Sequence, residues 1–251
     1  MRRFRLKVLI AVLLAAALGY GVHAVQSIAI RPPLVVGQDA VYPDAPAQVT
    51  LDDAGGRVLH IKPASGEASV LFVLYPGGLV RPQAYEWLGH ALAARGVETV
   101  IPEMPLDLAV LGTDRATALI DRYAAGRPVV LGGHSLGGAM AASYAAKNPA
   151  KLSGLILMAA YPAEGDSLTS ASFKALSLQA ELDGVAKADA VRGGLDRLPA
   201  GSRLVVIPGA VHSFFGRYGP QAGDGVPTVD RADAERAIVA AVIAYLDAGR
   251  A

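Results

Sequence analysis

The chain has 251 residues, of which 53% are hydrophobic and 18% charged, and its formal net charge is +1. This size fits one globular domain with a short leader, and the nearly balanced charge, with no basic cluster beyond the first residues, argues against nucleic-acid binding. The sequence contains no cysteine, which excludes disulfides, thiolate catalysis and cysteine-ligated metal sites.

Residues 1–25 have the composition of an export segment. Four basic residues within the first seven positions precede an uncharged run over residues 8–25. At about 1.5 Å per residue, a helix of this length spans most of a hydrocarbon core of about 30 Å. We predict an uncleaved membrane anchor, with a signal peptide cleaved after Ala24 or a buried amino-terminal helix as alternatives. Because the basic residues lie on the amino side, either export reading predicts a domain outside the cytoplasm, anchored or secreted to the periplasm.

The rest of the chain predicts a linker and one α/β domain. Residues 26–46 lack helical periodicity and are rich in Pro and Val toward their end, so we expect a linker there and a domain over residues 47–251. Strands are predicted at residues 47–51, 57–62, 70–75, 97–101, 128–131, 152–159, 175–179 and 203–207. Helices are predicted at residues 82–95 and 113–125, after Ser135 as far as Asn148, and at 230–246. Short apolar strands that alternate with helices predict a mostly parallel sheet with helices on both faces, after a first antiparallel pair.

The last of these helices is predicted to be scaffold. Its apolar stripe comprises Ile238, Ala241, Val242, Tyr245 and Leu246. Asp230 is the expected N-cap, with Asp233 in the first turn. We expect Arg231, Glu235 and Asp247 to face solvent.

The segment 128–140 combines an apolar strand, a sharp turn and an alanine-rich helix. Its centre, Gly133-His-Ser-Leu-Gly137, has the pattern of a nucleophile elbow. The turn forces Ser135 into a backbone region that costs roughly 1–3 kcal/mol, and Gly133 and Gly137 leave room where a Cβ would clash. The serine hydroxyl then lies at a helix amino terminus, where the N–H of Leu136 is a natural oxyanion donor. A glycine-rich turn in a protein without catalytic activity can have the same motif. The strand before residues 133–137 and the helix after them favour a catalytic serine here. No dinucleotide-binding or phosphate-loop motif is present.

A serine nucleophile needs a histidine base. The alternatives to His212 lie in the leader (His23), in an early strand (His60), within a helix (His90) and in the elbow itself (His134), where the side chain should point away from the serine. His212 follows the last strand and precedes the last helix. This is the place of the base in the order serine, acid, histidine.

The acid should follow an intervening strand and orient the histidine. Asp183, followed by Gly184, leaves the strand predicted at 175–179 and is our choice. Glu181 is the alternative, and Asp183 could instead serve only to cap the helix that follows. The second oxyanion donor is predicted to be the N–H of Gly78, with Leu79 as the alternative, in the loop after the first parallel strand.

These motifs resemble the α/β-hydrolase superfamily, and in particular small bacterial hydrolases related to dienelactone hydrolases. The resemblance covers about residues 70–246 and rests on the elbow, Pro76-Gly-Gly78, Asp183-Gly184 and His212, with residues 215–225 similar to one branch. It implies the α/β-hydrolase fold and acyl hydrolysis through an acyl-enzyme, without fixing the substrate.

Only residues 161–174 separate the strand after the elbow from the strand before the acid, so we expect a minimal cap. Side chains proposed to shape the substrate site are Leu79, Tyr85, Phe214 and Tyr218, although the aromatic ones could serve packing alone. The sequence thus predicts a serine hydrolase with Ser135 as nucleophile, His212 as base and Asp183 as acid, acting on a small ester-like acyl substrate. It implies no metal and no organic cofactor, and it predicts contact with the membrane through the amino-terminal segment. An acyltransferase with the same residues and a non-catalytic binding domain are the alternatives.

Overall fold

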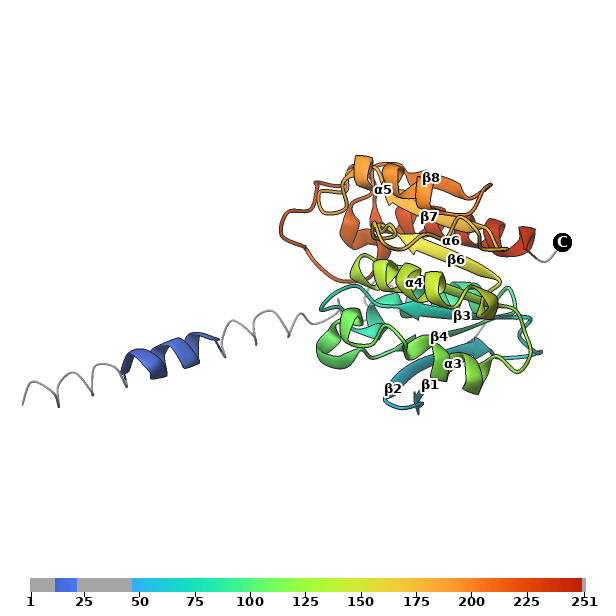
Figure 1. The fold of residues 1–251 in the computed structure, drawn as a ribbon, viewed down its shortest axis with the longest axis horizontal. Coiled ribbons are helices and arrows are strands. Elements are labelled where there is room, and N and C mark those ends of the chain that lie inside the picture. The colour runs from blue at the N-terminus through green and yellow to red at the C-terminus, as the bar shows by residue number, and fades with distance from the viewer. Residues whose placement is uncertain (1–11, 22–46, 250–251) are drawn as a thin grey trace, which may run out of the picture. The chain divides into compact units, whose positions relative to one another are not determined.

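The computed structural model describes residues 12–21 and 47–249 (Figure 1). The chain divides into two units, Met1–Arg31 and Pro32–Ala251. In the first unit residues 12–21 form a helix. The remainder of the predicted leader and the predicted linker at 26–46 lie outside the described residues. No helix in the two described ranges is long and apolar enough to cross a bilayer.

The second unit is built on a sheet of eight strands in the order β1-β2-β4-β3-β5-β6-β7-β8. The strands are β1 (Ala47–Asp53), β2 (Arg57–Pro63), β3 (Val70–Tyr75), β4 (Val97–Pro102), β5 (Val129–His134), β6 (Gly154–Met158), β7 (Ala175–Ala180) and β8 (Arg203–Ile207). The pairs β1–β2 and β2–β4 are antiparallel, and every other neighbouring pair is parallel. The predicted mostly parallel sheet is therefore confirmed.

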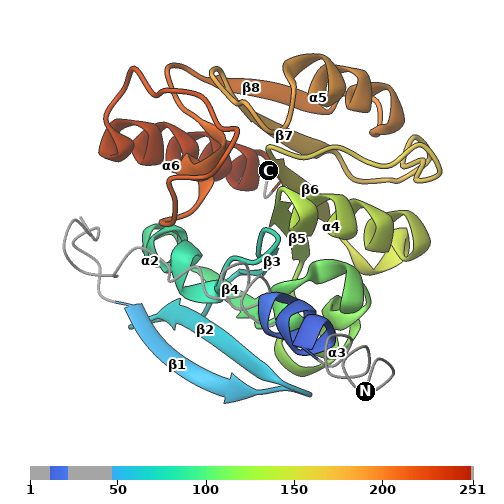
Figure 2. The ribbon, with the colours of Figure 1, turned by 90° about the vertical axis from the view of Figure 1, so that its left-hand side faces the viewer.

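Helices cover both faces of this sheet (Figure 2). The helices are α2 (Glu86–Ala93), α3 (Arg115–Tyr123), α4 (Leu136–Lys147), α5 (Ala188–Gly194) and α6 (Arg231–Ala248). The two-residue period of a strand divides β3 between two cores: Phe72 and Leu74 pack with residues of α2 and α6, whereas Val73 and Tyr75 pack with residues of α3 and α4. All residues of β3 are buried, as expected for a central parallel strand.

Short 3-10 helices complete the connections. They span Pro82–Tyr85, Pro105–Asp107, Ala109–Leu111, Pro149–Lys151, Leu195–Arg197 and His212–Phe215. The helix predicted at 82–95 is thus divided, and the backbone of Tyr85, at φ −112° and ψ 3°, separates its 3-10 turn from α2. Between β6 and β7 the structure shows no helix, in agreement with the predicted minimal cap.

The polar face of α6 differs from the prediction. Asp230 occupies the N-cap position without a side-chain capping bond. Glu235 is only 8% exposed and accepts hydrogen bonds from Arg217 Nε (2.9 Å) and Nη2 (2.7 Å). Arg231 donates to the carbonyl of Gly216 at 2.7 Å. The prediction of a solvent face for Arg231 and Glu235 was wrong because the loop after β8 folds back over this helix, which helical periodicity alone does not reveal.

Candidate active site

Ser135 lies at the turn between β5 and α4 with φ 53° and ψ −123°, a conformation that costs roughly 1–3 kcal/mol in a non-glycine residue. Its N–H donates to the carbonyl of Met158 at 2.9 Å, and its own carbonyl accepts the N–H of Ala139 at 3.0 Å. These bonds hold the strained residue between β6 and the first turn of α4.

Glycine is required on both sides of the serine. A Cβ on Gly133 would lie 2.4 Å from the carbonyl carbon of Gly137, and a Cβ on Gly137 would lie 2.2 Å from the carbonyl oxygen of Pro76. Backbone atoms cannot yield to such contacts without moving a strand, so the spacing in the motif has the steric cause expected from the sequence.

His212 and Asp183 meet at the carboxyl ends of β7 and β8. His212 Nδ1 lies 2.8 Å from Asp183 Oδ2, and both side chains are only 1% exposed. A carboxylate can only accept, so Nδ1 donates to it and the neutral ring keeps Nε2 as an acceptor. Asp183 Oδ1 accepts the N–H groups of Val185 (2.8 Å) and Ala186 (2.7 Å). Asp183 therefore both caps the turn before α5 and contacts His212.

His212 and Ser135 line one cavity of about 350 Å³. The Nε2 atom of His212 is buried and, within residues 47–249, has no hydrogen-bond partner. Because Asp183 occupies the other ring nitrogen, Nε2 is the atom of His212 that is free to accept a proton in this cavity.

Glu181, the alternative acid, makes a different contact. Its Oε2 accepts the N–H of Gly209 at 2.7 Å, which ties the end of β7 to the turn after β8. The carboxylate on His212 is that of Asp183.

Two unpaired backbone N–H groups lie near the serine. Gly78 packs on Leu136, since a Cβ on Gly78 would lie 3.2 Å from Leu136 Cδ2. Neither the backbone N–H of Gly78 nor that of Leu136 has a hydrogen-bond partner within the described part of the chain. In contrast, the N–H of Leu79 donates to the carbonyl of Asp107 at 2.8 Å. Leu79 is therefore not available as the alternative donor, whereas Gly78 is.

Comparison with protein families identifies the scaffold that carries this arrangement. Residues 71–235 match the model of the alpha/beta hydrolase family. The chain belongs to this family. Its membership supports a hydrolase activity, while the relation to dienelactone hydrolases stays a prediction.

Solved structures give the same fold for this α/β-hydrolase. The crystal structure of a predicted CIB-like hydrolase from Thermoplasma acidophilum superposes with a TM-score of 0.62 at 16% sequence identity. The match covers 79% of the present chain and 98% of the other chain. A comparison with curated proteins found no match.

The cavity of this α/β-hydrolase is lined by the predicted Ser135, His212 and Leu136 and otherwise by residues that the sequence did not predict. Besides Ser135 and His212 they are Leu136, Ala139, Ala159, Ala160, Tyr161, Ala163, Val185 and Ala186. Leu79, Tyr85, Phe214 and Tyr218 are not among them, so their prediction as substrate-binding residues is not supported. Small alanine side chains carry no distinctive sequence signal, and for this reason the prediction missed them.

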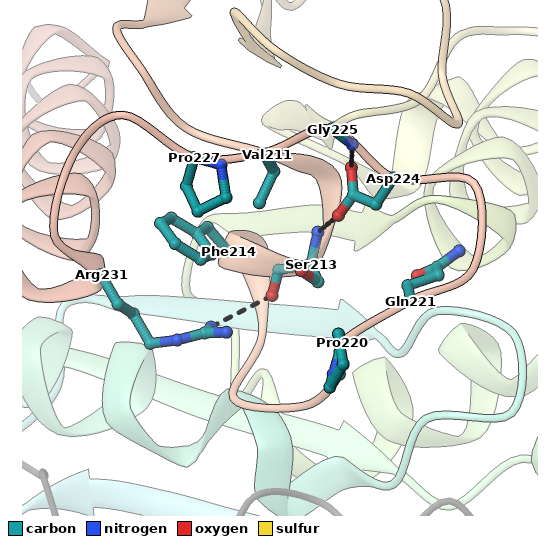
Figure 3. A pocket seen from close by; sticks show the side chains of 10 residues that line it. Val211, Ser213, Phe214, Pro220, Gln221, Asp224, Gly225, Pro227 and Arg231 are labelled. Carbon is teal, nitrogen blue, oxygen red and sulfur yellow. Dashed lines mark hydrogen bonds between the residues drawn. The ribbon is translucent and has the colours of Figure 1, made fainter.

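The aromatic residues of the loop after β8 pack inward instead. Phe214 lines a second cavity of about 290 Å³, where the Arg231 guanidinium lies 4.4 Å from its ring centroid (Figure 3). Tyr218 is 2% exposed and donates to Gln221 Oε1 at 2.7 Å. These side chains anchor the loop rather than form a wall of the serine cavity.

Asp224 was not predicted, yet it holds the backbone at His212. Its carboxylate accepts the N–H groups of His212, Ser213 and Gly225, each at 2.9 Å. Figure 3 shows the bonds from Ser213 and Gly225. Burial acts to raise the pKa of Asp224, but these hydrogen bonds outweigh burial and keep the pKa below its usual value. The carboxylate therefore remains ionised and fixes the peptide that carries His212.

His134 lies beside His212, with ring centroids 4.6 Å apart. It is fully buried, and burial, with a smaller contribution from the neighbouring His212, keeps the pKa of His134 well below its usual range. His134 is therefore neutral near pH 7. Within the described residues no group of three or more His, Asp or Glu is arranged to hold a metal ion.

Proposed function

We propose that this α/β-hydrolase is a serine hydrolase that cleaves small, neutral, ester-like acyl substrates through an acyl-enzyme. One observation carries the proposal. His212 is held by Asp183 through Nδ1, its buried Nε2 has no hydrogen-bond partner within the described residues, and His212 lines the cavity that also contains Ser135. This is the arrangement that a serine needs in order to lose its proton during attack.

The reaction would proceed in two halves. Ser135 Oγ attacks the acyl carbon as His212 Nε2 takes the hydroxyl proton, and Asp183 stabilises the resulting imidazolium. The N–H groups of Gly78 and Leu136 donate to the oxyanion, each worth about 3–4 kcal/mol in comparable sites. His212 then protonates the leaving alkoxide, and water repeats the sequence to release the acid and restore Ser135.

The cavity supports the substrate class. Apart from Ser135 and His212, its lining is apolar except for the hydroxyl of Tyr161, and it includes no Asp, Glu, Lys or Arg. A charged acyl group would lose its hydration there without a partner, which is costly. A volume of about 350 Å³ is near the lower end of small-molecule sites. A short apolar acyl group fits these properties.

The location of the enzyme is part of this proposal and rests on the sequence. The basic residues before the uncharged run at 8–25 favour a domain outside the cytoplasm, either anchored or released. A reporter enzyme active only in the periplasm, fused after Ala251, tests the orientation. A fusion protein that is produced intact but shows no reporter activity would contradict it.

Reaction with a fluorophosphonate probe tests the nucleophile. The full-length protein should be labelled once, whereas Ser135→Ala should take no label and hydrolyse no ester while keeping its circular dichroism spectrum. Ser167→Ala is the matched control, because Ser167 is an exposed serine outside the cavity. Labelling that persists in folded Ser135→Ala would contradict the proposal.

A further inference from the structure

Tyr85 lies between the oxyanion loop and the nucleophile elbow. The residue is fully buried and belongs to the 3-10 turn before α2. Its hydroxyl oxygen lies 2.8 Å from the N–H of Gly77 and 2.9 Å from His134 Nδ1. One hydroxyl group therefore bridges two segments that are far apart in the sequence.

The chemistry of the groups fixes the direction of the first hydrogen bond, and His134 Nδ1 is the only acceptor that the Tyr85 hydroxyl has within the described residues. The N–H of Gly77 can only donate, so the Tyr85 oxygen accepts it. The single phenolic proton is then free to be donated to His134 Nδ1, which accepts it in the neutral ring. Burial, which favours neutral His134 and raises the pKa of Tyr85 beyond its usual range, is consistent with this assignment.

The two bridged residues are each adjacent to a proposed oxyanion donor or to the nucleophile. Gly77 precedes Gly78, and His134 precedes Ser135 and Leu136 in the chain. The contact is close, since a Cβ on Gly77 would lie 2.9 Å from His134 Nδ1 and 3.0 Å from the Tyr85 oxygen. The hydroxyl thus sets the separation between the loop that carries the Gly78 N–H and the turn that carries Ser135.

We infer that Tyr85 is a positioning residue that aligns the oxyanion donors with Ser135, an inference that rests on the proposed serine-hydrolase function. Tyr85 does not touch the substrate, because it lies outside the lining of the serine cavity. Its loss should weaken transition-state binding more than substrate binding, since the donors act on the charge that develops at the substrate oxygen.

Tyr245 provides a matched control. Its hydroxyl also accepts a backbone N–H, that of Leu155 (3.1 Å), and donates to a second group, the carbonyl of Lys174 (2.6 Å). It lies on α6, outside the serine cavity. Tyr85→Phe and Tyr245→Phe therefore remove the same kind of bridge, one at the site and one away from it.

The experiment measures kcat and KM for a short ester per active site, with active sites counted by fluorophosphonate titration of the full-length protein. Tyr85→Phe should lower kcat about 10- to 100-fold with KM within about twofold, and should weaken binding of a trifluoromethyl ketone analogue by the same factor as kcat. Tyr245→Phe should leave kcat per site and ketone affinity unchanged.

His134→Leu removes the acceptor while Tyr85 stays, so it tests the inference even where Tyr85→Phe fails to fold. It should show the same loss in kcat, and the double variant should lose no more than either single one because the pair acts as a unit. Unchanged kcat per site in Tyr85→Phe or in His134→Leu, or an equal loss in Tyr245→Phe, would overturn the inference. A wild-type protein that takes no label would instead overturn the proposed function, and the inference with it.

Discussion

Asp183 accepts three hydrogen bonds, which are divided between the two oxygens of its carboxylate. Oδ1 accepts the N–H groups of Val185 and Ala186, and Oδ2 accepts from His212 Nδ1. An asparagine could keep its amide oxygen on the two N–H groups. Its amide nitrogen would then face His212 Nδ1 and force the ring proton onto Nε2, the wrong tautomer for a base.

Asp183→Asn should therefore lower kcat by about four orders of magnitude while leaving the urea midpoint of unfolding nearly unchanged. Glu181→Gln should keep kcat within about twofold, because its amide oxygen can still accept the N–H of Gly209. Steady-state kinetics and urea denaturation of both variants check this. A larger loss of kcat in Glu181→Gln than in Asp183→Asn would move the acid to Glu181.

At the residue scale, order along the chain was enough to predict Ser135, Asp183 and His212 as partners, and the structure brings Asp183 and His212 together. Asp224 and Tyr85 could not be assigned in the same way. Asp224 lies in an irregular loop without periodicity, and its role depends on backbone N–H groups that meet its carboxylate only after folding. The hydroxyl of Tyr85 contacts Gly77 and His134, which are far apart in the sequence, and composition does not show such a contact.

At the element scale, the loop after β8 depends on Asp224. Both carboxylate oxygens of Asp224 accept hydrogen bonds from backbone N–H groups, so an asparagine at this position would place an amide N–H against at least one of these N–H groups. Asp224→Asn should cost about 1–3 kcal/mol of unfolding free energy and should lower kcat because the His212 peptide loses its support. Asp233→Asn, at the exposed first turn of α6, is the control and should change neither. Full activity and stability in Asp224→Asn would show that the loop holds itself without this carboxylate.

The edge of the sheet has its own titrating group, His60 of β2. Its ring nitrogens lie 2.9 Å from the carboxylate of Asp52 of β1 and 2.7 Å from that of Glu98 of β4. The centroid of the Tyr123 ring lies 4.8 Å from that of His60, and Arg127 donates a hydrogen bond to Glu98. Burial acts to lower the pKa of His60, but Glu98 and Asp52 outweigh burial and raise it above its usual value of 6.5.

A raised pKa in the folded state means that charged His60 stabilises the fold fully below about pH 6.5 and loses this effect as the pH rises through the folded-state pKa. The difference in unfolding free energy between wild type and His60→Gln should therefore shrink as the pH rises from about 6 to 9. Denaturation across this range measures it. A difference that does not depend on pH would show that the pKa of His60 is the same in the folded and unfolded states.

Strands were the most predictable elements, because short β-branched runs between turns leave few alternatives. The order of the strands in the sheet required the structure, since β4 pairs with both β2 and β3 and no local pattern specifies that crossover. The burial of Glu235 likewise depends on Arg217, which lies in a loop that the helical period of α6 does not include.

For the molecule as a whole, the absence of a helical insertion between β6 and β7 limits the apolar surface around Ser135. The aromatic residues that could have closed over a long chain, among them Phe215 and Tyr218, are buried elsewhere. Each methylene sheltered by the cavity of about 350 Å³ contributes about 0.8 kcal/mol, and further ones stay in water.

We therefore expect kcat/KM for p-nitrophenyl esters to be highest for short acyl groups and to fall or stay flat from about C8 to C12. Detergent-free assays on the full-length protein measure this series. A steady rise from C4 to C12 would mean that another apolar surface, such as a bilayer, shelters the chain.

The central claim is that Ser135 carries the acyl group between the two halves of the reaction. The most direct measurement is to mix the protein with a short p-nitrophenyl ester, stop the reaction in acid within milliseconds, and locate the added acyl mass by peptide mapping. We predict that the acyl group is found on the peptide containing Ser135 and that Ser135→Ala carries none. In Asp183→Asn more acyl-enzyme should accumulate if that change slows deacylation more than acylation. Acylation of another residue, or ester hydrolysis by folded Ser135→Ala at the wild-type rate, would contradict the account.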